Sequence, residues 1–111
     1  MALKAPIEAG ASYSVRYASD LTSRGASLLI VGWVPKHGNQ VPGPQEKAIA
    51  PGKAGEISGT VPAFDDAVRI EIRVDLPDGT GSGTLELKQN GQAHSSGSIA
   101  TDITWTSLVD K

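Results

Sequence analysis

The chain has 111 residues, with ten Lys and Arg against twelve Asp and Glu and a formal net charge of −2. This length is typical of one domain, so we expect a single domain over residues 1–111. The basic residues are scattered among the acids, which argues against a nucleic-acid interface and against a polybasic membrane patch. The chain has no cysteine, which excludes disulfides and cysteine-ligated zinc.

The N-terminal arm, residues 1–10, lacks the apolar stretch of a secretory signal. The longest apolar run, residues 28–34, is far shorter than the about 20 residues that a membrane span needs. We therefore expect no membrane span. The expected location is the cytoplasm, or the outside of the cell after export without a cleaved signal.

The first half of the chain predicts two strands. Tyr13, Val15 and Tyr17 alternate with polar residues, which is typical of a half-buried strand. The run 28–34 is apolar on both faces and ends at a proline, which favours a central strand. Gly32 inside this run predicts a bulge or a close approach of another backbone.

A proline- and glycine-rich stretch follows over residues 35–55 and is long for a connection. We predict one long loop here, with a short edge segment at residues 46–50. A weaker strand is expected over residues 54–61, around Ile57.

The clearest strand spans residues 68–76, where aliphatic residues at even positions alternate with charged residues at odd positions. Leu85 and Leu87 predict a further strand, and Asn90-Gly91 is a strong signal for a two-residue hairpin turn. We expect a three-stranded meander over residues 68–95. In it, the charged face of residues 69–75 would pair across strands with Glu86 and Lys88.

A last strand is predicted over residues 99–109, with Ile99, Ile103, Trp105 and Val109 on one face. About seven short strands with polar outer faces indicate an all-β fold, an antiparallel β-sandwich of immunoglobulin-like, C2-like or jelly-roll type. A small β-barrel is the alternative.

No catalytic motif accompanies the two histidines, His37 and His94. His94 has serine neighbours, but no nucleophile elbow such as G-x-S-x-G is present. We therefore predict that the protein is not an enzyme.

The proline- and glycine-rich loop is the predicted recognition element, because loops on rigid scaffolds commonly carry binding residues. Trp33 at the strand end is a candidate for stacking on a ligand, although its ring is also expected in the core. The candidate ligand-binding residues are Trp33, Lys36, His37, Asn39 and Gln40.

Acidic residues near turns are weak candidates for a calcium site, because calcium prefers several oxygen ligands from loops. The ordinary alternative is turn chemistry, which Asp78-Gly79 fits well. We expect no cofactor, with calcium as a weak alternative. The acids concerned are Asp65, Asp66, Asp75 and Asp78.

Three functions stay open. The first is a non-catalytic binding or adhesion module that recognises a protein or a carbohydrate through its loops. The second is a structural or assembly subunit, such as a virion or appendage protein or an obligate oligomer, whose arms, residues 1–10 and 35–54, cover a neighbour's sheet edge. The third is a calcium-dependent sandwich that binds a surface.

Overall fold

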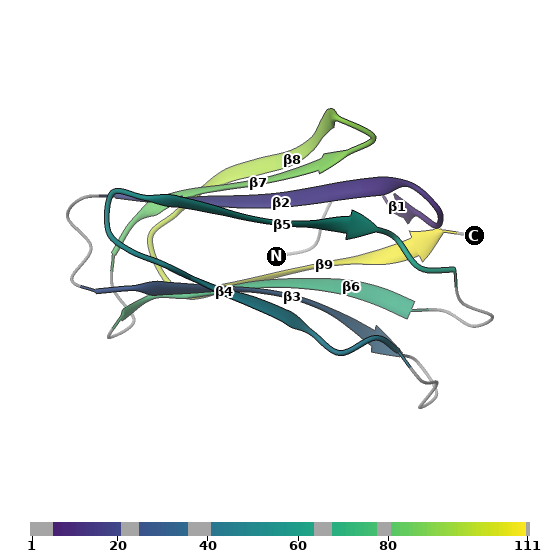
Figure 1. Cartoon of the computed structure of the whole chain (residues 1–111), viewed down its shortest axis with the longest axis horizontal. Helices are drawn as coiled ribbons and strands as arrows, with labels where there is room; N and C mark the ends of the chain where they lie inside the picture. The colour runs from purple at the N-terminus through teal and green to yellow at the C-terminus, as the bar shows by residue number, and fades with distance from the viewer. Residues whose placement is uncertain (1–5, 21–24, 36–40, 64–67, 78–80, 111) are drawn as a thin grey trace.

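The computed structural model describes residues 6–20, 25–35, 41–63, 68–77 and 81–110, and these residues form nine strands and no α-helix. The strands are arranged in two sheets that pack face to face (Figure 1), so the predicted β-sandwich is confirmed. The strands are β1 (Ile7–Glu8), β2 (Ser12–Ser19), β3 (Ser27–Pro35), β4 (Gln45–Ile49), β5 (Ala54–Thr60), β6 (Val68–Asp75), β7 (Gly83–Gln89), β8 (Gln92–Ile99) and β9 (Ile103–Asp110).

The first sheet has the order β1-β9-β6-β3-β4, and the second has the order β5-β2-β7-β8. All neighbouring strands run antiparallel except β1, which pairs parallel with β9. The predicted three-stranded meander over residues 68–95 is therefore wrong. β7 and β8 form the expected hairpin, but β6 belongs to the opposite sheet.

The hairpin turn follows the sequence prediction. Asn90 and Gly91 both have positive φ, 52° and 77°, which a type I′ turn requires. By contrast, the strand expected over residues 99–109 is divided in two. Ile99 ends β8, and β9 begins only at Ile103.

The long loop expected over residues 35–55 contains a full edge strand, β4, which pairs with β3. The predicted edge segment is thereby confirmed, shifted by one residue. Gly32 faces this part of the chain, because a Cβ on Gly32 would lie 3.3 Å from Pro44 Cβ. The close approach predicted from Gly32 is thus present, and the pairing of β3 with β6 runs through Gly32 without a shift in register.

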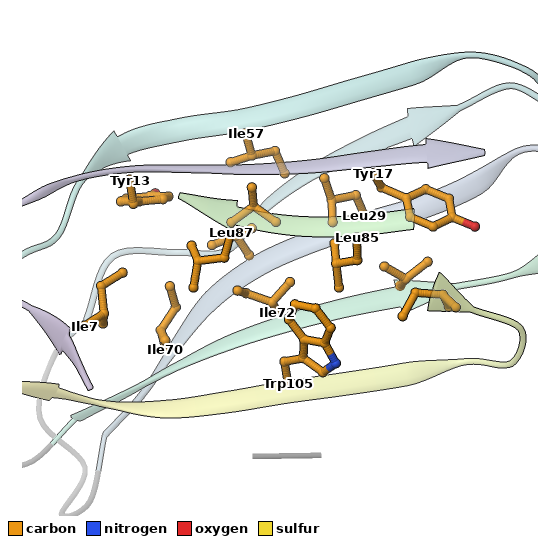
Figure 2. Close-up of a cluster of buried hydrophobic side chains, with 14 of the residues drawn as sticks. Ile7, Tyr13, Tyr17, Leu29, Ile57, Ile70, Ile72, Leu85, Leu87 and Trp105 are labelled. Atoms are coloured by element: carbon orange, nitrogen blue, oxygen red, sulfur yellow. The ribbon is translucent and has the colours of Figure 1, made fainter. Parts of the chain in front are cut away.

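The core lies between the sheets and follows the predicted alternation. Val68, Ile70, Ile72 and Val74 on β6 are at most 1% exposed. Trp105 from β9 belongs to the same cluster as Ile70, Ile72 and Val74, and Tyr17, Leu85 and Leu87 enter it from the second sheet (Figure 2). One hydrophobic cluster therefore joins both sheets.

The N-terminal arm closes one side of this core. Ile7 on β1 is fully buried and lies opposite Val109. The backbone N–H of Ala9 donates to the carbonyl of Asp110 at 2.7 Å, and that of Glu8 donates to Gln89 Oε1 at 2.8 Å. The described part of the arm thus covers an edge of its own sheet.

Two core tyrosines predict an alkaline limit to stability. Burial raises the pKa of Tyr13. Burial also raises the pKa of Tyr17; the Asp20 charge raises this pKa further, whereas the Ser27 hydroxyl lowers it. A raised pKa means that the folded state holds the phenolic proton more tightly. Stability is therefore complete below the unfolded pKa of about 10 and is lost as the pH rises through the folded pKa.

We expect the melting temperature to fall as the pH rises above about 10, and to fall less steeply in Tyr17→Phe, which has no phenolic proton to lose. Lysine deprotonation affects both proteins equally, so the difference in slope isolates Tyr17. Equal slopes in thermal melts followed by circular dichroism would contradict the role of Tyr17.

Candidate binding surface

The predicted loop site is only partly described. Trp33 lies opposite Ile70 and on the inner face of its sheet. Its ring packs edge-on against Tyr13, with centroids 5.8 Å apart and an angle of 82° between the planes. Of the two interpretations of Trp33, this geometry favours core packing over stacking on a ligand. The other candidates, Lys36, His37, Asn39 and Gln40, lie outside the described residues.

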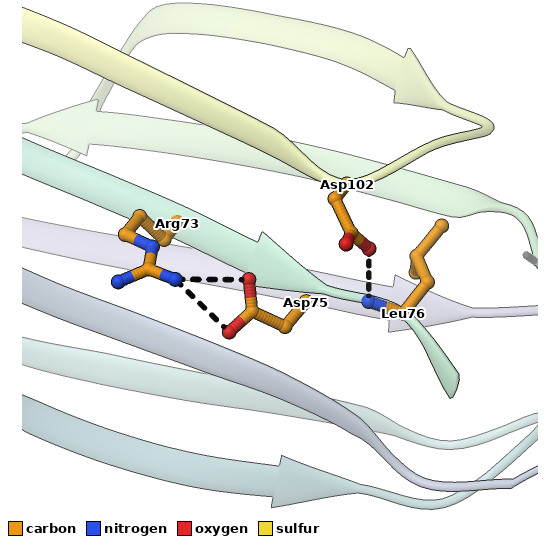
Figure 3. A network of polar contacts seen from close by, with 4 residues as sticks. All are labelled: Arg73, Asp75, Leu76 and Asp102. Carbon is orange, nitrogen blue, oxygen red and sulfur yellow. Dashed lines mark hydrogen bonds and ion pairs between the residues drawn. The ribbon is translucent and has the colours of Figure 1, made fainter. Parts of the chain in front are cut away.

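Among the predicted calcium ligands, only Asp75 is described; Asp65, Asp66 and Asp78 are not. Arg73 Nη2 lies 3.3 Å from each carboxylate oxygen of Asp75 (Figure 3). Nearby, Asp102 Oδ1 accepts a hydrogen bond of 2.7 Å from the backbone N–H of Leu76. Within the described ranges, no three His, Cys, Asp or Glu side chains come together as metal ligands.

His94 lies at an irregularity in the β7–β8 hairpin. Leu87 pairs with Ser95 while Lys88 pairs with Ala93, so His94 is the extra residue of a β-bulge. Its Nδ1 lies 2.9 Å from Ser95 Oγ, and its Nε2 lies 3.3 Å from the carbonyl oxygen of Pro6. Because a carbonyl only accepts, Nε2 carries the proton in its contact with Pro6. The pair ties the N-terminal arm to β8.

The outer face of the first sheet carries a row of alternating charges along β6. Arg69, Glu71, Arg73 and Asp75 point away from the core, because the residues between them are buried. The expected pairing of this row with Glu86 and Lys88 is wrong, since those residues lie on the second sheet and form their own contact at 3.8 Å. The neighbours of the row are instead β3 and β9.

Aliphatic side chains flank this charged row. Leu28 and Ile30 on β3 are half-buried and alternate with buried residues, so they lie on the outer face. Val34 is 41% exposed and Leu108 is 45% exposed, and they are the large hydrophobic residues in the described ranges that are exposed. Arg69 pairs with Val34 on one side and with Leu108 on the other. We call this outer face of β3, β6 and β9 the β6 face.

The outer face of the second sheet is different. Its outward positions on β2 and β5 hold Ser, Thr, Ala and charged residues, with Arg16 lying between Glu56 and Glu86. None of these outward residues is a large aliphatic one. The two faces of the sandwich therefore differ in chemistry, and the β6 face is the one that exposes apolar surface next to charge.

Sequence reasoning missed the β6 face, although signals for it were present. The run 28–34 is apolar at both parities, and Leu108 has the opposite parity to Trp105. Only one face of a sheet in a sandwich packs on the core, so aliphatic residues of the other parity must lie on its outer face. The sequence lacked only the information that β3 and β9 lie on either side of β6.

Fold and surface together define a small all-β protein with one chemically distinct sheet face. The described residues include no helix long and apolar enough to cross a membrane. Comparisons with known protein families, with characterised proteins and with solved structures find no match.

Proposed function

We propose that this protein is a non-catalytic binding module that contacts another polypeptide chain through the β6 face. The observation that carries the proposal is the exposure of Val34 and Leu108 on either side of Arg69. Exposed aliphatic residues beside charged ones are typical of protein-contact surfaces, in which an apolar centre excludes water and charges select the partner.

The chemistry of the face favours a polypeptide over a carbohydrate. Sugar rings are commonly held by exposed aromatic rings, and the described part of this face offers aliphatic and charged side chains instead. Trp33, the aromatic candidate for stacking, lies on the inner side of the sheet. Recognition through residues 36–40 stays a prediction beside this proposal.

Two features weigh against the other candidate functions. Asp75, the described calcium candidate, has its carboxylate beside Arg73, which lowers its availability as a ligand. The described parts of the two arms, β1 and β4, pair with β9 and β3 of the same chain. Assembly by arm exchange therefore has less support than contact through a sheet face.

Site-directed photo-crosslinking in extracts of the native host tests the proposal. We expect a covalent adduct to another chain when a benzophenone amino acid replaces Val34. We expect no adduct when it replaces Ser58, which is exposed on the outer face of the second sheet. No adduct at position 34, or equal adducts at both positions, would contradict the proposal.

A further inference from the structure

We propose that the partner of the β6 face is a second copy of this chain, packed face to face. The two copies are related by a two-fold axis that lies in the plane between the two sheets and runs perpendicular to the β6 strand. This inference rests on the proposed function and names its partner. It starts from the order of charges along β6, which is positive at Arg69, negative at Glu71, positive at Arg73 and negative at Asp75.

This charge order is complementary to itself when it is reversed. Outward side chains on a strand recur about every 6.6 Å, so two β6 rows laid antiparallel can match position by position. Arg69 then lies opposite Asp75 of the second copy, and Glu71 lies opposite Arg73 of the second copy. All four positions of each row meet the opposite charge. A parallel arrangement in the same register would bring like charges together at every position, which is strongly unfavourable.

The same axis matches part of the apolar surface, on the β3 side of the row. On β3, Leu28, Ile30, Gly32 and Val34 lie beside Asp75, Arg73, Glu71 and Arg69 in turn. The axis passes between Glu71 and Arg73, and hence between Ile30 and Gly32. It therefore places Leu28 against Val34 of the second copy. Ile30 lies opposite the position of Gly32 of the second copy, which is covered by Pro44. Leu28 and Val34 would bury each other, while the charged row sets direction and register. On the β9 side, Leu108 lies opposite the position of Asp102 of the second copy.

The size of the surface predicts a weak dimer. The β6 face and the adjoining β4 make four strands, which at about 4.8 Å apart and about 23 Å long give a flat footprint of about 440 Å² per copy. This area is at the low end for specific complexes, where contacts are commonly transient. Packed sheets also cross at about 30°, so the central pair of Glu71 and Arg73 should fit best. We expect a dissociation constant of about 10 μM.

Charge reversal at the central pair gives the sharpest test. Glu71→Arg places a new positive charge opposite Arg73 of the second copy, and the two-fold axis repeats this clash. Arg73→Glu places two negative charges opposite each other in the same way. We expect each variant alone to weaken association at least about tenfold. Mixed in equal amounts, the two variants again present opposite charges at all four positions, so the mixture should dimerise like the wild type.

Sedimentation velocity measures the association of the wild type, of each variant and of the mixture from about 1 μM to about 1 mM. This range spans the expected dissociation constant, and circular dichroism checks that each protein is folded. Arg73→Glu also removes the contact with Asp75, but both side chains are substantially exposed, and such a pair adds little stability. Glu56→Arg, on the outer face of the second sheet, is the matched control and should dimerise like the wild type.

A dimer that is weakened by each single reversal and restored in the mixture supports the inference. A wild-type protein that stays monomeric at the highest of these concentrations overturns the dimer inference. In that case, a crosslinked adduct between position 34 and a different protein would still support the proposed function. A dimer that Glu71→Arg leaves unchanged also overturns it, because the contact would then lie on another surface. So would two weakened variants that fail to associate when mixed.

Discussion

Replacing Trp105 with alanine is expected to lower the free energy of unfolding by about 3–5 kcal/mol. Trp105 is 2% exposed and belongs to the cluster that joins the two sheets. Its indole N–H has no hydrogen-bond partner among the described residues, so the loss is one of packing alone. Domains of this size are stable by about 5–15 kcal/mol in total, so the variant should unfold at a much lower urea concentration.

Leu108→Ala is the matched control for this prediction. Leu108 lies on the same strand with the opposite parity and is 45% exposed. We expect its free energy of unfolding to stay within about 0.5 kcal/mol of the wild type. Equal losses in the two variants, measured by urea unfolding at a concentration where the wild type is monomeric, would contradict the described orientation of β9.

The second large effect is expected in the N-terminal arm. Ile7→Ala should lower the free energy of unfolding by about 2–5 kcal/mol, because Ile7 is fully buried beside Val109. The arm is short, and its backbone is held by Ala9 and Glu8. Loss of the buried side chain should therefore also release the arm, which would appear as faster hydrogen exchange at the Ala9 amide.

Glu8→Ala separates the side chain of the arm from its backbone. The Glu8 side chain is exposed, whereas its backbone N–H donates to Gln89 and is kept in this variant. We expect a stability close to that of the wild type. If Ile7→Ala were as mild as Glu8→Ala, the arm would not be part of the core.

The candidate surface shows where reasoning from single strands stops. The alternation in the sequence already indicated that Leu28, Ile30 and Leu108 lie on the face opposite to the buried residues. Alternation shows which face of a strand a residue occupies, but it does not show which strand lies beside it. The β6 face exists because β3 and β9 flank β6, and those pairings join residues far apart in the sequence. For the same reason, the sequence wrongly placed Glu86 and Lys88 beside the β6 charges.

Local chemistry determined the central strands β2, β3, β6 and β7, their buried parity and the Asn90-Gly91 turn, because these depend on a side chain's immediate neighbours and on backbone φ. Only the tertiary structure decided that β6 and β7 lie in different sheets, that Ile99 and Ile103 belong to separate strands and that β1 joins β9 in parallel. Alternation every second residue is the same whichever sheet a strand enters. The choice of partner is made by burial against residues distant in the chain, which no local pattern records.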